Sequence, residues 1–205
     1  MNKYHDITRE LLRIQAVQIK TKGYFTWTSG IQSPIYCDNR LTMSYPDVRQ
    51  KITASFIQLM EERQLTPDII AGCATAGIPH AAWLAQELNL PMIYVRSKPK
   101  GHGKGNQIEG ELAEGKKVLV IEDLISTGGS SIEAAEAIEH AGGTVSAVFS
   151  IFTYGLKKAT DAFLDSGFSQ YSLTGFDQLI EDLRINREIN DQEAVELLTW
   201  RNKLA

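Results

Sequence analysis

Cysteine is scarce in this 205-residue chain, which contains only Cys37 and Cys73 and no Cys-x-x-Cys pair. The sequence therefore offers no disulfide framework and no paired-cysteine metal site, and we expect both thiols to be free. No apolar run approaches the ~18 residues that a membrane-spanning helix needs. The first residues, MNKYHDITREL, also lack the hydrophobic region of a signal peptide. These absences lead us to expect a cytoplasmic protein with no membrane partner.

An excess of positive charge is missing as well. The chain has 21 Lys and Arg against 25 Asp and Glu, which gives a formal net charge of −4. Because general nucleic-acid binders are usually basic, we expect no nucleic-acid partner. The length suits one α/β domain with a small addition, and such a domain can bury a substantial core.

The most informative stretch is VLVIEDLISTGGSS, residues 118–131. It begins with an apolar run typical of a buried strand, and the adjacent carboxylates Glu122 and Asp123 follow this run directly. Hydroxyl side chains and two glycines come next, before a helical pattern begins. A helix N-terminus presents unpaired N–H donors, and glycines let the backbone approach an anion closely. The stretch therefore predicts a sugar-phosphate site, in which the carboxylates accept ribose hydroxyls or lie near a hydrated Mg²⁺. An ordinary βα turn, the alternative, has no use for paired acids at a strand end.

Apolar strand patterns alternate with helical patterns from residue 68 onward. We predict strands over residues 68–71, 92–95, 117–121, 145–151 and 169–173, and helices over residues 46–62, 79–88, 131–140, 156–164, 176–183 and 191–203. This order indicates an α/β fold with a five-stranded, mostly parallel sheet covered on both faces. Ligands of such sheets bind beyond the carboxyl ends of the strands.

A smaller N-terminal addition precedes this core. The apolar spacing predicts a helix over residues 4–19, and two extended pieces, residues 20–30 and 33–40, predict a small antiparallel unit. We therefore expect a single domain over residues 1–205, made of an N-terminal addition (1–45), an α/β core (46–175) and C-terminal helical segments (176–205).

A basic, glycine-rich loop follows the strand predicted over residues 92–95. The loop reads RSKPKGHGKG and carries potentially cationic side chains on Arg96, Lys98, Lys100, His102 and Lys104. A charge run alone is typical of a solvated hairpin tip. This one leaves a strand end on the expected ligand side and combines charge with glycine hinges, which favours a lid that closes over an anion.

Residues 118–131 resemble the signature of the type I phosphoribosyltransferases, which bind 5-phosphoribosyl 1-diphosphate (PRPP). The basic loop is similar to the mobile catalytic loop of the orotate phosphoribosyltransferases, and GYFTWTSGIQSPIYCDNR, residues 23–40, resembles the hood that shapes the base pocket of that family. The resemblance implies the type I phosphoribosyltransferase fold and the transfer of a phosphoribosyl group from PRPP to orotate. It also implies a homodimer in which the loop reaches into the neighbouring subunit's site.

The same resemblance implies roles for individual residues. Lys100, His102 and Asp123 would be catalytic. PRPP would be bound by Arg96, Lys100, His102, Glu122, Asp123, Leu124, Ile125, Ser126, Thr127, Gly128, Gly129 and Ser130, and orotate by Ser126 and Phe25. Arg40 is a hypothetical further partner of orotate, for its carboxylate, and a surface role for Arg40 is the alternative. Mg²⁺ is the expected cofactor; it would be held mainly by PRPP, with Glu122 and Asp123 nearby.

Three positions depart from the pattern of many orotate phosphoribosyltransferases. Ala76 stands where a lysine often binds the diphosphate, and residues 151–155, IFTYG, contain no arginine for orotate. The lysine expected ahead of the Phe-Thr pair has two candidates, Lys20 and Lys22. A purine or uracil phosphoribosyltransferase therefore stays open as an alternative. The acidic balance and the lack of room for a second domain argue against a PRPP-sensing regulator that binds nucleic acid.

Overall fold

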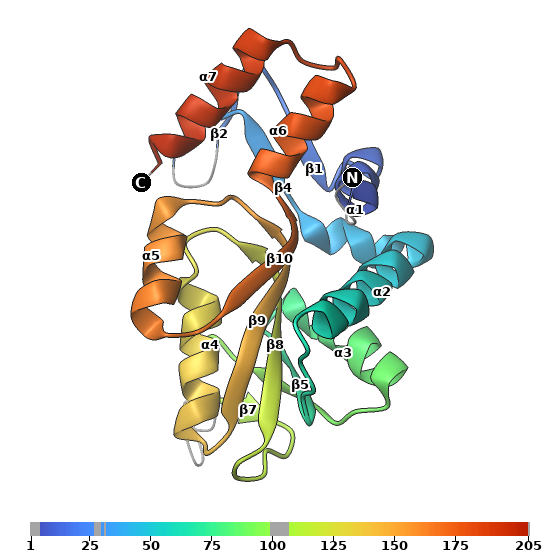
Figure 1. Ribbon diagram of the computed structural model, residues 1–205, viewed down its shortest axis with the longest axis vertical. Helices are drawn as coiled ribbons and strands as arrows, with labels where there is room; N and C mark the ends of the chain where they lie inside the picture. Colours follow the sequence, from blue (N-terminus) through green and yellow to red (C-terminus); the bar gives the residue numbers. More distant parts are fainter. Residues whose placement is uncertain (1–4, 27–29, 31, 99–106, 205) are drawn as a thin grey trace.

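A six-stranded sheet with the order β10-β9-β8-β5-β6-β7 forms the centre of the computed structural model, which describes residues 5–26, 30, 32–98 and 107–204 (Figure 1). The strands are β5 (Ile69–Cys73), β6 (Met92–Val95), β7 (Ile108–Glu109), β8 (Lys117–Ile125), β9 (Thr144–Thr153) and β10 (Gln170–Gly175). All neighbours pair in parallel except β6 and β7, which are antiparallel. The five predicted strands are therefore present, and β7 adds a sixth.

Helices cover both faces of this sheet. α2 (Pro46–Glu62) and α3 (Gly77–Leu88) lie on one face, whereas α4 (Gly129–His140) and α5 (Lys157–Ser166) lie on the other (Figure 1). Successive residues of a strand point to opposite faces. Leu119 accordingly packs in the cluster on the α2 side and Val120 in the cluster on the α4 side. Burial of both faces explains why the strands are continuous apolar runs.

The position of the acid pair differs from the prediction. The strand expected to end at residue 121 continues to Ile125, so Glu122 and Asp123 lie within β8 rather than after it. Pairing with β5 stops at Ile121, whereas pairing with β9 continues to Ile125. The end of β8 therefore extends past its neighbour β5, and apolarity alone could not reveal this because the extension carries charged side chains.

The hood, as we call the described residues 5–44, is a small antiparallel unit as predicted. It contains α1 (His5–Arg13), β1 (Val17–Ile19), β2 (Phe25–Thr26), β3 (Gln32–Ser33), β4 (Ile35–Cys37) and the 3-10 helix η1 (Asn39–Ser44). β1 pairs with β4, and β2 pairs with β3. The helix predicted to reach residue 19 ends at Arg13, because Gln15 adopts a left-handed conformation (φ 58) and the next apolar residues join a strand.

The C-terminal helices α6 (Phe176–Ile185) and α7 (Asp191–Asn202) lie beside the hood (Figure 1). The indole N–H of Trp200 donates to the carbonyl oxygen of Gln32 at 3.1 Å, and the hydroxyls of Thr8 and Thr174 lie 2.5 Å apart. Segments from both ends of the chain therefore build this end of the molecule. Among the described residues, none of the helices combines the length and apolar character that crossing a membrane requires.

Candidate functional site

The strand order reverses between β5 and β8. The chain leaves β5 toward β6 and later returns to place β8 on the other side of β5. The helices that follow these two strands, α3 and α4, cover opposite faces of the sheet (Figure 1). Ligands of parallel α/β sheets bind in the crevice that forms at such a reversal, and β8 brings its acid pair to this point.

Glu122 is buried, and its carboxylate binds the start of α4. Oε1 accepts the backbone N–H of Asp123 at 2.9 Å, while Oε2 accepts the hydroxyls of Ser131 at 3.3 Å and Ser130 at 3.4 Å. Burial, together with the negative charge of Asp123, raises the pKa of Glu122 from 4.5 to about 8. Burial also raises the pKa of Asp123. Glu122 therefore holds its proton to a higher pH than an ordinary carboxyl group, and the buried pair resists carrying two negative charges.

The loop after β8 presents the N-terminus of α4. Gly128 adopts a φ of +82°, and a Cβ at this position would stand 2.9 Å from the ring of Phe163. Thr127, Gly129 and Ser130 are exposed, and within the described chain no side chain caps α4. The first N–H groups of α4 are therefore available to an anion, which the helix dipole also favours.

Leu124 and Ile125 differ from the other members of the predicted PRPP set. Ile125 is 1% exposed, and its carbonyl oxygen accepts the N–H of Tyr154 at 3.0 Å. Leu124 packs against the cluster on the α2 side. Ile125 thus lies in the interior and Leu124 is partly buried, whereas Thr127, Gly129 and Ser130 are exposed.

The turn after β5 lies directly against β8. It contains a cis peptide bond between Ala74 and Thr75, and Thr75 is exposed. A Cβ on Gly77, the first residue of α3, would lie 2.3 Å from the carbonyl oxygen of Ile121. The start of α3 therefore touches the strand that carries the acid pair, and Ala76, where a lysine was expected, directly precedes Gly77.

Only the base of the predicted lid lies within the described residues. The Arg96 guanidinium is 3.4 Å from Oε1 of Glu109, and the backbone N–H of Arg96 donates to the carbonyl oxygen of Gln107 at 2.9 Å. Lys98 is exposed. Lys100, His102 and Lys104 lie outside the described residues.

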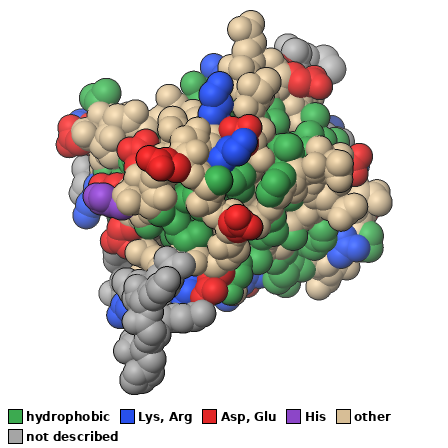
Figure 2. Space-filling view, turned by 90° about the horizontal axis from the view of Figure 1, so that it is seen from below, with side chains coloured by type: hydrophobic (Ala, Val, Ile, Leu, Met, Phe, Trp, Pro, Cys, Tyr) green, Lys and Arg blue, Asp and Glu red, His purple; other side chains and the backbone are tan. Residues whose placement is uncertain are grey.

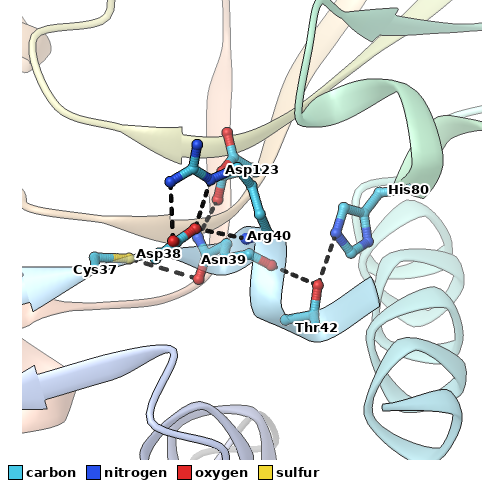
Figure 3. Close-up of polar contacts among 7 residues, drawn as sticks. All are labelled: Cys37, Asp38, Asn39, Arg40, Thr42, His80 and Asp123. Carbon is cyan, nitrogen blue, oxygen red and sulfur yellow. Dashed lines mark hydrogen bonds and ion pairs between the residues drawn. The ribbon is translucent and has the colours of Figure 1, made fainter. Parts of the chain in front are cut away.

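Arg40, predicted to bind orotate, is paired with Asp38. Nε of Arg40 lies 2.6 Å and Nη2 lies 2.9 Å from the two carboxylate oxygens, and the Arg40 side chain is 64% exposed. It lies beside Asp123 (Figure 3), where its charge opposes part of the rise in the pKa of Asp123 that burial causes. Arg40 therefore stands at the edge of the acid-pair site with one carboxylate partner already in place.

Phe25, the other predicted orotate contact from the hood, lies on β2. Nζ of Lys20 stands 4.2 Å from the centre of its ring, and the ring of Tyr36 is 5.9 Å away. Of the two lysines ahead of the Phe-Thr pair, Lys20 is therefore the one whose ammonium group makes a cation–π contact with Phe25.

Asn39 was not predicted from the sequence, yet it joins the hood to β8. It is 1% exposed, and its Nδ2 donates to the carbonyl oxygen of Asp123 at 2.6 Å (Figure 3). The two residues are 84 positions apart. No local spacing signals a contact of this kind, so sequence reasoning had no means of finding it.

Charge is mixed on the face shown in Figure 2, where acidic and basic side chains of the described residues are interspersed with apolar ones. Within the part of the chain that the structure describes, no group of three or more His, Cys, Asp or Glu side chains is placed to hold a metal ion. The acid pair at the end of β8 thus remains the site that geometry and sequence support together.

Comparison with known proteins supports the same assignment. A family model described as "Phosphoribosyl transferase domain" matches residues 44–169. The chain is 64% identical to an orotate phosphoribosyltransferase of Oceanobacillus iheyensis over 100% of both chains, and 55% identical to that of Bacillus subtilis over 95% of this chain and 90% of the relative. The crystal structure of orotate phosphoribosyltransferase from Aeropyrum pernix is similar, with a TM-score of 0.76, 28% identity, and coverage of 86% of this chain and 97% of that chain. The predicted fold class is therefore confirmed, and the chain belongs to the orotate phosphoribosyltransferase family.

Proposed function

We propose that this protein transfers the phosphoribosyl group of PRPP to orotate, which yields orotidine 5′-monophosphate and diphosphate. The observation that carries the proposal is the end of β8, where the acid pair leads into a glycine loop and the exposed N-terminus of α4. This arrangement stands in a chain that is 64% identical to an orotate phosphoribosyltransferase.

The reaction exchanges one bond at the anomeric carbon of the ribose. The C–O bond to the diphosphate breaks, its electron pair leaves with the diphosphate, and orotate N1 supplies the pair for the new C–N bond. Positive charge develops on the sugar while negative charge grows on the leaving group. The protein must therefore bind both substrates in line and stabilise two opposite charges.

The 5′-phosphate would bind the loop from Ser126 to Ser130, where hydroxyls and the N–H groups of α4 converge. Asp123 would accept the ribose hydroxyls and stabilise the cationic sugar by its charge. Glu122 would stabilise this arrangement, because its carboxyl group on β8 accepts hydrogen bonds from Ser130 and Ser131 at the start of α4.

Mg²⁺ suits this site as a partner of the substrate. Mg²⁺ is commonly held by one or two carboxylates together with substrate phosphates, and it keeps several waters. Asp123 would supply a carboxylate of this kind, with Glu122 nearby. When bound, the ion would neutralise charge on the diphosphate.

The lid would complete the site. Arg96, Lys100 and His102 would bind the diphosphate, and a protonated His102 would donate to the leaving oxygen. We also propose that the protein acts in the cytoplasm as a homodimer, in which each lid reaches the partner's site. Ser126, Phe25 and Arg40 would bind orotate, with Arg40 facing its carboxylate.

An ultraviolet assay of orotate consumption tests the proposal. The purified protein is mixed with orotate, PRPP and Mg²⁺, while uracil and purine bases are assayed in parallel. We expect loss of orotate that depends on all three additions, and we expect Lys100→Ala to reduce turnover strongly. If only another base were consumed, that base and not orotate would be the substrate. PRPP binding without turnover of any base would favour a regulator.

A further inference from the structure

A buried row of polar contacts joins α3, η1 and β8 next to the acid pair (Figure 3). The Thr42 hydroxyl donates to the carbonyl oxygen of Asn39 at 2.6 Å, and Nε2 of His80 lies 3.2 Å from the same hydroxyl. Nδ2 of Asn39 in turn donates to the carbonyl oxygen of Asp123. Asn39, Thr42 and His80 are each at most 2% exposed. We refer to these three residues as the polar bridge.

The direction of each hydrogen bond follows from the available protons. The single proton of the Thr42 hydroxyl goes to Asn39, so this hydroxyl can only accept from His80. His80 must therefore carry its proton on Nε2. On the other side, the Cys37 thiol donates to Oδ1 of Asn39 at 3.5 Å. This contact leaves Nδ2 to face Asp123, so the amide of Asn39 has one orientation.

The bridge completes a closed triangle of contacts. α3 touches β8 at Gly77, where a Cβ would meet the carbonyl oxygen of Ile121. η1 binds β8 through Asn39 and Asp123, and α3 binds η1 through His80 and Thr42. Each element thus contacts the other two, and the two hydrogen bonds restrain η1 relative to β8 and α3.

We propose that Asn39, Thr42 and His80 are positioning residues that set the spacing between the base side and the ribose side of the site. The inference rests on the proposed function: Arg40, next to Asn39 on η1, faces orotate, and Asp123 on β8 binds the ribose. Reacting atoms must lie about 3–3.5 Å apart, and a misplacement of about 1 Å can cost on the order of 100-fold in rate. A shift of η1 against β8 separates the two substrates while each keeps its own contacts.

Substitutions at Thr42 and His80 test this inference through kcat and both KM values. Thr42→Val removes the hydroxyl and keeps the shape, and His80→Phe removes the donor and keeps the ring. We expect each to lower kcat by about tenfold or more while both KM values stay within about threefold, because positions change and contacts do not. Thr42→Ser and His80→Gln retain a hydroxyl and an N–H donor, so they should recover most of the lost kcat.

A matched control and a double variant separate positioning from general damage. Thr53→Val removes another largely buried threonine hydroxyl, one that donates within α2 at 3.0 Å, and it should leave kcat unchanged. The double variant Thr42→Val/His80→Phe should have the kcat of the more impaired single variant, because both changes remove the same hydrogen bond between His80 and Thr42. The inference would be overturned if the losses of kcat in the two single variants multiplied in the double variant. An unchanged kcat in Thr42→Val, or equal losses of kcat in Thr42→Ser and Thr42→Val, would also overturn it. Thr42→Ala replaces Thr42→Val should that variant fail to fold.

Hydrogen exchange supplies a readout that needs no turnover. The amides of residues 122–125 should exchange faster in Thr42→Val than in the unaltered protein or in Thr53→Val, since Asn39, which contacts Asp123 at the end of β8, loses the hydrogen bonds that hold η1 against α3. Equal exchange in all three would overturn the positioning role. Absence of orotate turnover in the unaltered protein would instead overturn the proposed function, and the exchange result would still decide whether the bridge holds β8.

Discussion

Replacing Glu122 with glutamine should change how the stability of the protein depends on pH. The pKa of Glu122 is raised from 4.5 to about 8 in the folded protein, chiefly by burial. Between these two values the folded protein binds more protons than the unfolded chain. The free energy of unfolding should therefore fall as the pH rises through this range. Glutamine carries no ionisable group, so Glu122→Gln should remove most of this fall.

The structure sets the size of the effect. The pKa of Glu122 rises by about 3.5, and each pKa unit corresponds to about 1.4 kcal/mol. The loss of stability with rising pH therefore has a ceiling of about 5 kcal/mol. Asp123 titrates together with Glu122, so part of the pH-dependent loss of stability belongs to Asp123 and is not removed by Glu122→Gln. We therefore expect wild type to lose about 2–4 kcal/mol relative to Glu122→Gln between about pH 5 and pH 8.5. The three hydrogen bonds of the Glu122 side chain persist in Glu122→Gln, because the glutamine amide can accept from the Asp123 N–H and donate to the hydroxyls of Ser130 and Ser131.

Urea unfolding followed by circular dichroism, without ligands, measures this difference at each pH. Glu133→Gln is the matched control, because Glu133 is an exposed residue of the same helix, α4. Its stability curve should run parallel to that of wild type. If Glu122→Gln also ran parallel to wild type over the whole range, Glu122 would not carry a raised pKa, and our account of the acid pair would be wrong.

Three further predictions concern the site and the hood. Gly128 has a φ of +82°, and a methyl group at this position would meet the ring of Phe163 at 2.9 Å. Gly128→Ala should therefore lower stability by about 1–3 kcal/mol and weaken PRPP binding, measured by calorimetric titration, at least about tenfold. Arg40→Ala should raise KM for orotate at least about tenfold and leave KM for PRPP within about threefold; the opposite pattern would move Arg40 to the PRPP side. Glu10→Gln should lower stability by about 1–3 kcal/mol at neutral pH, because the buried Glu10 carboxylate binds Lys51 and Arg13. Burial opposes ionisation of Glu10, but these partners prevail and lower its pKa, so the loss should vanish as the pH falls through that pKa.

The sequence predicted those elements whose signals are local. The parallel strands and the helices of the core each depend on neighbouring residues, and they appear within a few positions of the expected bounds. The two-residue strand β7 was missed because it is too short to show alternation. The helix predicted to residue 19 was wrong because strand pairing with β4 overrides the helical spacing of Val17 and Ile19.

The sequence predicts residues for the candidate site but not the contacts that support them. The acids and the glycine loop are contiguous, so their order alone indicates a sugar-phosphate site. The burial of Glu122, the pairing of Arg40 with Asp38 and the contact of Asn39 with Asp123 depend on how distant segments pack. Residue types do not encode such distances, and only the folded chain reveals them.

The contact between Trp200 and Gln32 has a consequence for the order of folding. It joins a strand of the hood, β3, to a helix residue that lies 168 positions later in the chain. Closing a loop of this length costs more entropy than forming the hairpin-range contacts within the hood. The strand therefore gains this support late in folding, after both distant segments have formed their own local structure.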